Sequence, residues 1–292
     1  MENLEVELRR VSEAWRLAVD RHVLGLQALA NAAAALIASV CAIIAMLLLQ
    51  RNGLASVFGL LVGAAGFGAA GLVLASGVAA VHRQVYFGAA SAYGPWRQAW
   101  RFLQHNCSAI AGGYGVCYGV FLLLVCVLLI LTSVARLGEP AQLLFAVLLI
   151  PLVAIAAAAV MAMVYGVFVA TAEAALNERS LVRLLSAMLE HSPCRCCSLL
   201  RSMTGAFAAA ALAALPPVAL LLLSIVLILV LAGVVVGIVF TGGAILVMCI
   251  FAFVLLAVAL APATALFAVL IGAAWRDLCE PDEPGEAASP EA

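Results

Sequence analysis

Residues 204–275 read TGAFAAAALAALPPVALLLLSIVLILVLAGVVVGIVFTGGAILVMCIFAFVLLAVALAPATALFAVLIGAAW. No Asp, Glu, Lys, Arg or His occurs between Thr204 and Trp275. A water-soluble domain has no interior that hides such a run, whereas a bilayer needs about 20 apolar residues for each helical crossing. The stretch therefore predicts two membrane crossings, or three short ones, and an integral membrane protein.

The composition of the whole chain agrees with this interpretation. The chain has 292 residues, of which 67% are hydrophobic and only 10% are charged, and its mean hydropathy is +1.22. Soluble domains carry about 25% charged residues. A transmembrane barrel would show alternating segments of about 10 residues, but these runs are apolar on every face. The predicted fold class is all-α, because helices satisfy their own backbone hydrogen bonds in lipid.

Six apolar segments are long enough to cross a membrane, and they form three predicted hairpins. The turn residues of Arg51-Asn52-Gly53 and of 136–140 separate the members of the first two pairs. The break at 237–243 is weaker, and it is either a full turn or a re-entrant dip. The predicted spans are 26–50, 54–81, 108–135, 143–171, 206–236 and 243–273.

The arginines predict how these spans are oriented, since the chain contains no lysine. If the spans alternate direction, twelve arginines lie on the side of both termini and only Arg51 and Arg136 lie on the other side. Basic residues are enriched in cytoplasmic loops. Both termini are therefore expected in the cytoplasm. The twelve are Arg9, Arg10, Arg16, Arg21, Arg83, Arg97, Arg101, Arg179, Arg183, Arg195, Arg201 and Arg276.

An amphipathic segment precedes each predicted hairpin. These segments lie in the N-terminal region 1–25, in 95–103 and in 180–188, and each has apolar residues at helical spacing. We expect interfacial helices, with Trp96 and Trp100 at headgroup depth and Arg97, Arg101, Arg179 and Arg183 reaching lipid phosphates. The domain organisation is then an N-terminal cytoplasmic amphipathic helix (1–25), a membrane domain (26–275) and an acidic, disordered tail (276–292).

One stretch of the chain resembles a known family. Leu149-Ile150-Pro151 leads through a predicted span to Val169-Ala170-Thr171, and Asn177-Glu178-Arg179-Ser180-Leu181 then begins an amphipathic segment that leads to Leu199-Leu200. This pattern resembles the bacterial six-span YciC-like proteins and the membrane domains attached to some glycerophosphodiester phosphodiesterases. The resemblance implies six spans and an inner-membrane location. It implies no catalytic residue.

Residues that could support catalysis are scarce. Predicted mid-membrane positions carry no ionisable group, and His82 and Glu173 fall at the ends of spans two and four. Glu173 is expected to be an interfacial carboxylate, with a functional role as the alternative. The chain has no P-loop, no HExxH and no Gly-x-Ser-x-Gly. We therefore predict no enzyme, no cofactor and no nucleic-acid partner.

Nine cysteines occur, and three of them are crowded together with a histidine. His191, Cys194, Cys196 and Cys197, joined by Cys279, are the candidates for a metal site. Because Cys194-x-Cys196-Cys197 lacks the usual Cys-x-x-Cys spacing, we expect a polar hinge after Ser192-Pro193, with metal and redox roles as alternatives. The cysteines inside predicted spans are expected to be small apolar packing residues: Cys41, Cys117, Cys126 and Cys249.

Glycines and prolines mark several predicted spans. Glycines four residues apart let helices approach closely, and they predict packing within the chain or between two copies. Prolines interrupt spans four, five and six, which indicates kinks or, alternatively, transporter-like broken helices. The glycine pairs are Gly59 and Gly63, Gly115 and Gly119, and Gly233 and Gly237, and the prolines are Pro151, Pro216, Pro217 and Pro262.

Two function classes remain after these observations. The first is a non-enzymatic membrane component that packs with lipids, with partner proteins or with itself, and presents its interfacial helices as docking surfaces. The second is a channel or permease-like subunit for a small uncharged or apolar solute, which would use the proline breaks together with Tyr114, Tyr118 and Tyr165.

Overall fold

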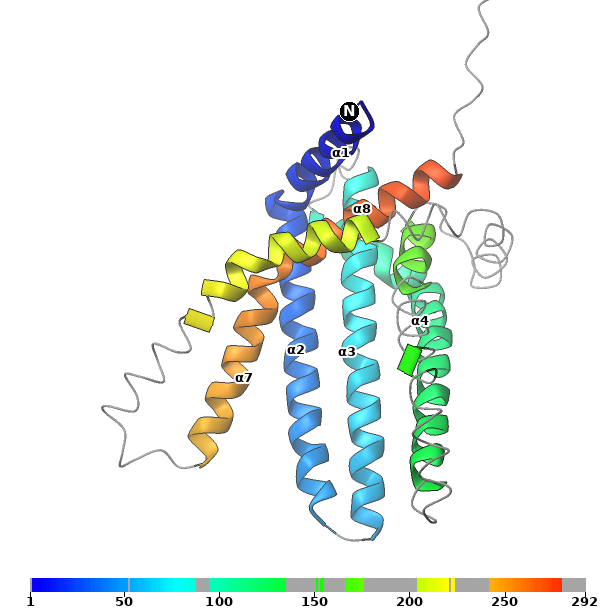
Figure 1. Cartoon of the computed structure of the whole chain (residues 1–292), viewed down its shortest axis with the longest axis vertical. Coiled ribbons are helices and arrows are strands. Elements are labelled where there is room, and N and C mark those ends of the chain that lie inside the picture. Colours follow the sequence, from blue (N-terminus) through cyan, green and yellow to red (C-terminus); the bar gives the residue numbers. More distant parts are fainter. Residues whose placement is uncertain are drawn as a thin grey trace, which may run out of the picture.

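The computed structural model describes residues 2–51, 53–87, 95–134, 151, 153–154, 166–175, 204–220, 222–223 and 242–279. Within these ranges the chain is helical and contains no strand, as the sequence predicts (Figure 1). The elements are α1 (Glu2–Ala18), α2 (Arg21–Leu49), α3 (Leu54–Phe87), α4 (Pro95–Val134), α7 (Gly242–Ala259) and α8 (Ala261–Cys279), with two shorter apolar helices, Gly166–Ala175 and Thr204–Leu220.

Three of these helices are long and apolar enough to cross a membrane. They contain the candidate spans Arg21–Leu49, Leu54–Tyr86 and Arg97–Val127, and α7 and α8 supply a fourth if the bent pair is one span. Only 17%, 17% and 11% of their most apolar windows are buried inside the protein. Their apolar side chains therefore face outward, as they do in lipid. Most of the predicted span 143–171 and nearly half of the predicted span 206–236 lie outside the described residues.

Helices α2 and α3 form a close antiparallel hairpin. Gly53 has a φ of 75°, which a side chain would disfavour, and it makes the turn just before α3 begins. Gly63, Gly66 and Gly77 of α3 then face the small residues Ala45, Cys41 and Ala30 of α2. A Cβ on Gly59 would lie 2.9 Å from the Ala45 carbonyl oxygen and 3.1 Å from Leu48 Cβ. Gly59 and Gly63, the predicted packing pair, both lie in this contact.

The segment 95–103 differs from the prediction of a separate interfacial helix. It forms the first turns of α4, which runs without a break to Val134. Ala99 and Phe102 are buried, whereas Trp100 is 64% exposed, and its expected place at headgroup depth stays a prediction. Helix α4 is continuous because no residue between Leu103 and Ser108 stops a helix, and the polar turns extend the span.

Helix α1 is a separate amphipathic helix, as predicted for the N-terminal region. It ends near Val19, and the Asp20 carboxylate accepts a hydrogen bond from the His22 amide to cap α2. The face that carries Ala14 and Ala18 is buried, and α1 packs mainly on α8. Trp15 remains 41% exposed. The apolar face of α1 therefore serves protein packing at least in part.

The predicted sixth span is two helices. The chain bends by 41° between α7 and α8, at Leu260. Pro262 follows the break, lacks an N–H and cannot donate to the carbonyl four residues earlier. The predicted proline kink is therefore present, and it is sharp enough to divide the span.

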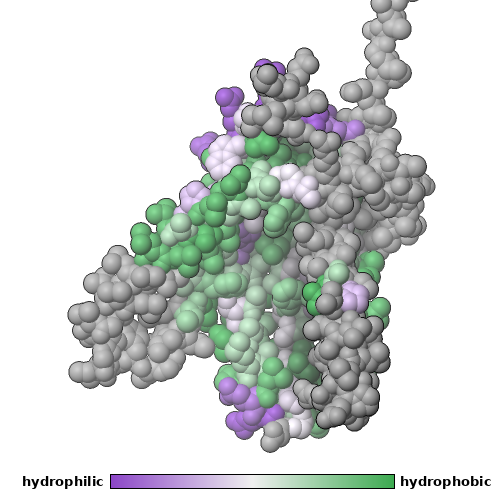
Figure 2. Space-filling view, viewed as in Figure 1, coloured by the Kyte–Doolittle hydropathy of each residue, from purple (hydrophilic) through white to green (hydrophobic). Residues whose placement is uncertain are grey.

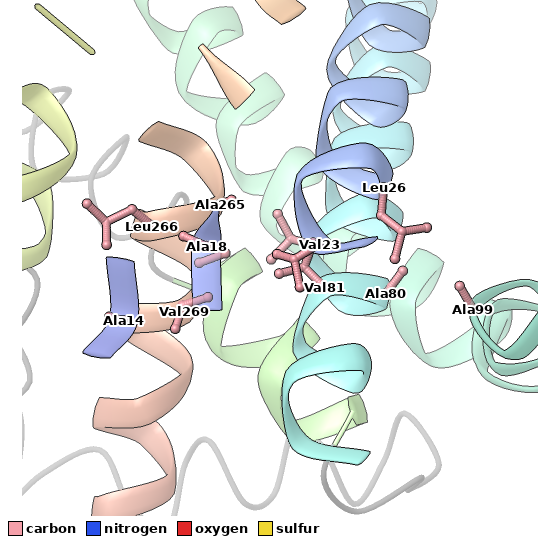
Figure 3. Close-up of a cluster of buried hydrophobic side chains, with 12 residues drawn as sticks. Ala14, Ala18, Val23, Leu26, Ala80, Val81, Ala99, Ala265, Leu266 and Val269 are labelled. Carbon is pink, nitrogen blue, oxygen red and sulfur yellow. The ribbon is translucent and has the colours of Figure 1, made fainter. Parts of the chain in front are cut away.

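The buried hydrophobic clusters gather at one end of the molecule. One cluster joins α1, α2, α3, α4 and α8 around Val81 and Leu266 (Figure 3), and the other joins α3, α4 and the helix Gly166–Ala175. Hydrophilic residues lie at this end and also at the opposite end, which carries the α2–α3 turn (Figure 2). We call the end that holds the buried clusters the arginine-rich end, after Arg9, Arg10, Arg16, Arg21, Arg83, Arg97, Arg101 and Arg276.

Candidate functional site at the arginine-rich end

Few polar side chains are buried in the described part of the chain, and four of these six, Gln27, Asn31, His82 and Glu173, belong to two groups. The first group joins α3, α8 and the helix Gly166–Ala175, and we call it the interhelical polar cluster: His82, Arg83, Glu173 and Trp275. The second group joins α2 to the α7–α8 break, and we call it the amide cluster: Gln27, Asn31 and Thr264.

Glu173 and Trp275 form the centre of the interhelical polar cluster. The indole Nε1 of Trp275 donates to Glu173 Oε2 at 2.9 Å. Both side chains are buried, at 1% exposure for Glu173 and 3% for Trp275. Helix α8 packs its indole directly over the Glu173 carboxyl group, and the expected position of Glu173 at the membrane interface stays a prediction. This bond ties α8 to a segment about 100 residues earlier in the chain.

His82 ties α3 to the same face of α8. Its Nε2 lies 2.8 Å from the carbonyl oxygen of Ala268. Because a carbonyl oxygen only accepts, Nε2 carries the proton and donates it. Gly272 lies one helical turn further along α8, where a Cβ would come within 3.0 Å of His82 Cδ2 and would also meet the Tyr86 hydroxyl. Only glycine at this position lets the two helices close over the imidazole.

Arg83 connects the cluster to the remaining helices of this end. Its Nη1 donates to the carbonyl oxygen of Ala175 in the helix Gly166–Ala175 at 3.2 Å. Its guanidinium carbon lies 5.6 Å from the ring centre of Phe102 on α4. Arg83 therefore holds three segments together through one side chain.

The position of the cluster along α3 places it near the membrane surface. His82 lies 28 residues beyond Leu54, or about 42 Å at 1.5 Å per residue. A hydrocarbon core is about 30 Å thick. If α3 enters the membrane at Leu54, the cluster lies at headgroup depth or beyond, where water competes for polar groups. Burial under α8 protects these hydrogen bonds from that competition.

The chemistry of the cluster is that of interhelical bonding. Among the described residues, each hydrogen bond just given links one helix to another. A nucleophile paired with a base is absent from these residues, and no group of three or more His, Cys, Asp or Glu side chains in the described ranges could hold a metal ion. The arrangement joins four segments into one body and leaves the arginines of α1, α2 and α4 exposed around it.

The structure covers only part of the predicted site residues. His191, Cys194, Cys196, Cys197, Arg179 and Arg183 lie outside the described residues, as do Gly233 and Gly237. Cys279 is the last residue of α8, and Trp96 belongs to the first turn of α4. Arg97 and Arg101 are exposed on the surface of α4. The roles proposed for all of these residues stay predictions.

Among the predicted packing residues, the outcome differs between α3 and α4. A Cβ on Gly115 or Gly119 would meet no described atom within 4 Å, so the second glycine pair makes no close contact in the described part of the chain. Cys41 packs onto Gly66, as expected of a small apolar residue. Cys126 and Cys249 are exposed, so the packing role expected of these two is wrong within the described residues.

Tyr114 and Tyr118 occupy the α3–α4 contact. Their rings stack with centroids 5.7 Å apart, and the Tyr118 hydroxyl donates to the Ala64 carbonyl oxygen at 2.5 Å. Gly68 and Gly71 provide the space that these two rings fill. These tyrosines therefore bind α4 to α3, and Tyr165 lies outside the described residues.

Three important residues were missed by the sequence interpretation. Gln27 and Asn31 lie in the first span at a spacing of four, which puts both amides on one helix face. That spacing in an apolar span was an available signal, since buried amides in lipid require partners. Trp275, by contrast, gave no signal, because a tryptophan at the end of a span is typical of a membrane interface.

No protein-family model matches the chain, and no curated protein or solved structure matches it either. The function proposed below therefore depends on the residues and the geometry of this chain.

Proposed function

We propose that the protein is a non-enzymatic, multi-pass component of the bacterial inner membrane that binds a partner through its arginine-rich end. It has six spans in three hairpins and places both termini in the cytoplasm. The resemblance to six-span YciC-like proteins and the arginine distribution support this architecture. The partner is another membrane protein, a second copy of the chain or the lipid surface.

The observation that carries the proposal is that some polar groups at this end are buried between helices and others are exposed. The buried ones, His82, Glu173 and Trp275, bond helix to helix, whereas arginines of α1, α2 and α4 remain at the surface. A catalytic or transport site would instead direct its buried polar groups towards a substrate. This arrangement supports a rigid platform with exposed arginines, and an exposed arginine can pair with an acidic group of a partner.

A second candidate function is supported by the broken span. Discontinuous helices with polar side chains at the break form substrate sites in many transporters. The α7–α8 break and the amide cluster have this character. Under this alternative the protein is a channel or permease-like subunit for a small uncharged or apolar solute. Tyr114 and Tyr118, which pack against α3, then take no part in the pathway.

The experiment that separates the two functions is purification in mild detergent followed by mass spectrometry. A stoichiometric protein or retained anionic lipid is expected, and it should be lost when Arg97 and Arg101 are both replaced by Ser. The matched control replaces Arg51, at the opposite end, with Ser and should retain the partner. A bound uncharged solute without any protein or anionic lipid would contradict the proposal and favour the alternative.

A further inference from the structure

We infer that Asn31 of α2 is a latch that holds the α7–α8 span in its bent form. The amide bonds a backbone carbonyl that a straight helix would use itself. The sixth predicted span then has two arrangements, one bent with the latch engaged and one straight with the latch released. This device is independent of whether the protein binds a partner or conducts a solute.

The break leaves backbone groups that need new partners. In an uninterrupted helix the N–H of Ala261 would donate to the carbonyl oxygen of Ala257, four residues earlier. Here Leu260 donates to Leu256 at 2.9 Å, and Thr264 donates to Leu260 at 3.0 Å, on the two sides of the bend. The Ala257 carbonyl oxygen instead accepts from the Asn31 side chain, Nδ2, at 2.9 Å. A side chain of α2 has replaced a backbone donor of the broken helix.

The orientation of the Asn31 amide follows from its partners. The Ala257 carbonyl only accepts, so the nitrogen of the amide must face it. The same Nδ2 lies 3.1 Å from Thr264 Oγ1, which belongs to α8. One NH2 group therefore contacts both sides of the break, and it fixes the angle between them. Asn31 itself is 4% exposed.

Gln27 holds this amide in place from one helical turn away. Its Nε2 donates to Asn31 Oδ1 at 2.8 Å, and Gln27 is 1% exposed. Its own Oε1 has no hydrogen-bond partner among the described residues. A buried acceptor without a partner is unfavourable. The presence of Gln27 in an apolar span is explained if its NH2 group is needed to orient Asn31.

Releasing the latch would move α7 by a measurable distance. Residue Phe251 lies nine residues before the break, or about 13 Å from it along α7. Removing a bend of 41° about Leu260 would displace it by about 9 Å, from the chord of that rotation. The N-terminal end of α7, twice as far from the break, would move by about 19 Å. Phe251 is 64% exposed and tolerates a probe.

The test measures distances by electron spin resonance in the full-length chain, with native cysteines replaced and labels at Phe251 and at Leu47 or Leu60. Leu47 on α2 and Leu60 on α3 are 60% and 58% exposed, and the two distances together locate Phe251. Pro262→Ala restores the missing N–H, and we expect it to shift the label by about 9 Å. Asn31→Leu should produce the same shifted population in part or in full. Asn106→Leu, the matched control, removes a buried amide of α4 that donates to the Phe102 carbonyl oxygen of its own helix, and it should retain the wild-type distances.

The double variant N31L/P262A decides whether Asn31 acts through the break. If it does, the double variant has the distances of P262A alone, because a straight helix no longer needs the latch. Unchanged distances in N31L would overturn the inference. Separate, additive shifts from N31L and P262A would overturn it too, since Asn31 would then act elsewhere. Should N31L fail to fold, Asn31→Ser applies the same two criteria.

Discussion

Trp275→Phe tests the interhelical polar cluster most severely among single changes. Phenylalanine keeps an aromatic ring in place but removes the N–H that donates to Glu173 Oε2 at 2.9 Å. A buried acceptor that loses its donor costs about 1–3 kcal/mol. The smaller ring leaves roughly 40 Å² of apolar surface unfilled, which costs about 1 kcal/mol more at 25 cal/mol per Å². The expected loss in the free energy of unfolding is therefore about 3 kcal/mol.

The matched control makes the same chemical change on an exposed indole. Trp100 is 64% exposed, compared with 3% for Trp275, so Trp100→Phe should change stability by no more than about 0.5 kcal/mol. The assay is loss of helical circular dichroism on heating in mild detergent. A loss of 3 kcal/mol corresponds to a fall in Tm of roughly 6–12 °C for a chain of this size.

A double-mutant cycle separates the hydrogen bond from the ring size. In a Glu173→Leu background the Oε2 acceptor is gone, so Trp275→Phe should cost only the packing loss of about 1 kcal/mol. The reasoning is refuted if W275F and W100F lower Tm equally. It is refuted as well if W275F costs the same in both backgrounds, because the indole and the carboxyl group would then not be coupled.

Three further predictions concern other parts of the chain. Gly59→Leu should destabilise the α2–α3 hairpin by about 1–3 kcal/mol, because a Cβ there lies 2.9 Å from the Ala45 carbonyl oxygen. The control Gly115→Leu, whose Cβ meets no described atom within 4 Å, should leave Tm unchanged in the same thermal assay. Equal effects of the two variants would contradict the contact assigned to Gly59. Replacing Cys194, Cys196 and Cys197 together by Ser should leave expression, membrane insertion and metal content unchanged, because a hinge tolerates a small polar residue; stoichiometric zinc or iron lost in the triple variant would show a metal site. In a variant that keeps only Trp100, bromines near the lipid headgroups should quench its fluorescence strongly, since tryptophan favours that depth; quenching only by bromines deep in the acyl chains, or none at all, would place α4 differently.

The helical spans were predictable because their signal is local. A run of apolar residues such as 26–50 or 54–81 needs about 20 positions to be recognised, and α2 and α3 contain these runs. The kink at Pro262 was predictable for the same reason, since the missing N–H is a property of one residue. The angle of 41° was not, because it depends on Asn31 from another helix.

The contacts between helices could not be predicted from such local patterns. Glu173 and Trp275 are about 100 residues apart, and neither residue type in its local context indicates the other. The 95–103 segment shows a different difficulty. An amphipathic helix that lies flat and one that continues into a span share the same 3.6-residue period, so only the continuous backbone of α4 distinguishes them. Likewise, Gly59 and Gly115 have identical spacing signals, yet only Gly59 faces a neighbouring helix among the described residues.

The central claim is a multi-pass protein with its arginine-rich end in the cytoplasm, and alkaline phosphatase fusions test it most directly. The enzyme is active only outside the cytoplasm. Fusions after Gly53, in the α2–α3 turn, and after Ala135, beyond the end of α4, should be active. Fusions after Leu103 and Trp275, both at the arginine-rich end, should be inactive. An active fusion after Leu103 or Trp275, or an inactive fusion after Gly53, would contradict the proposed orientation.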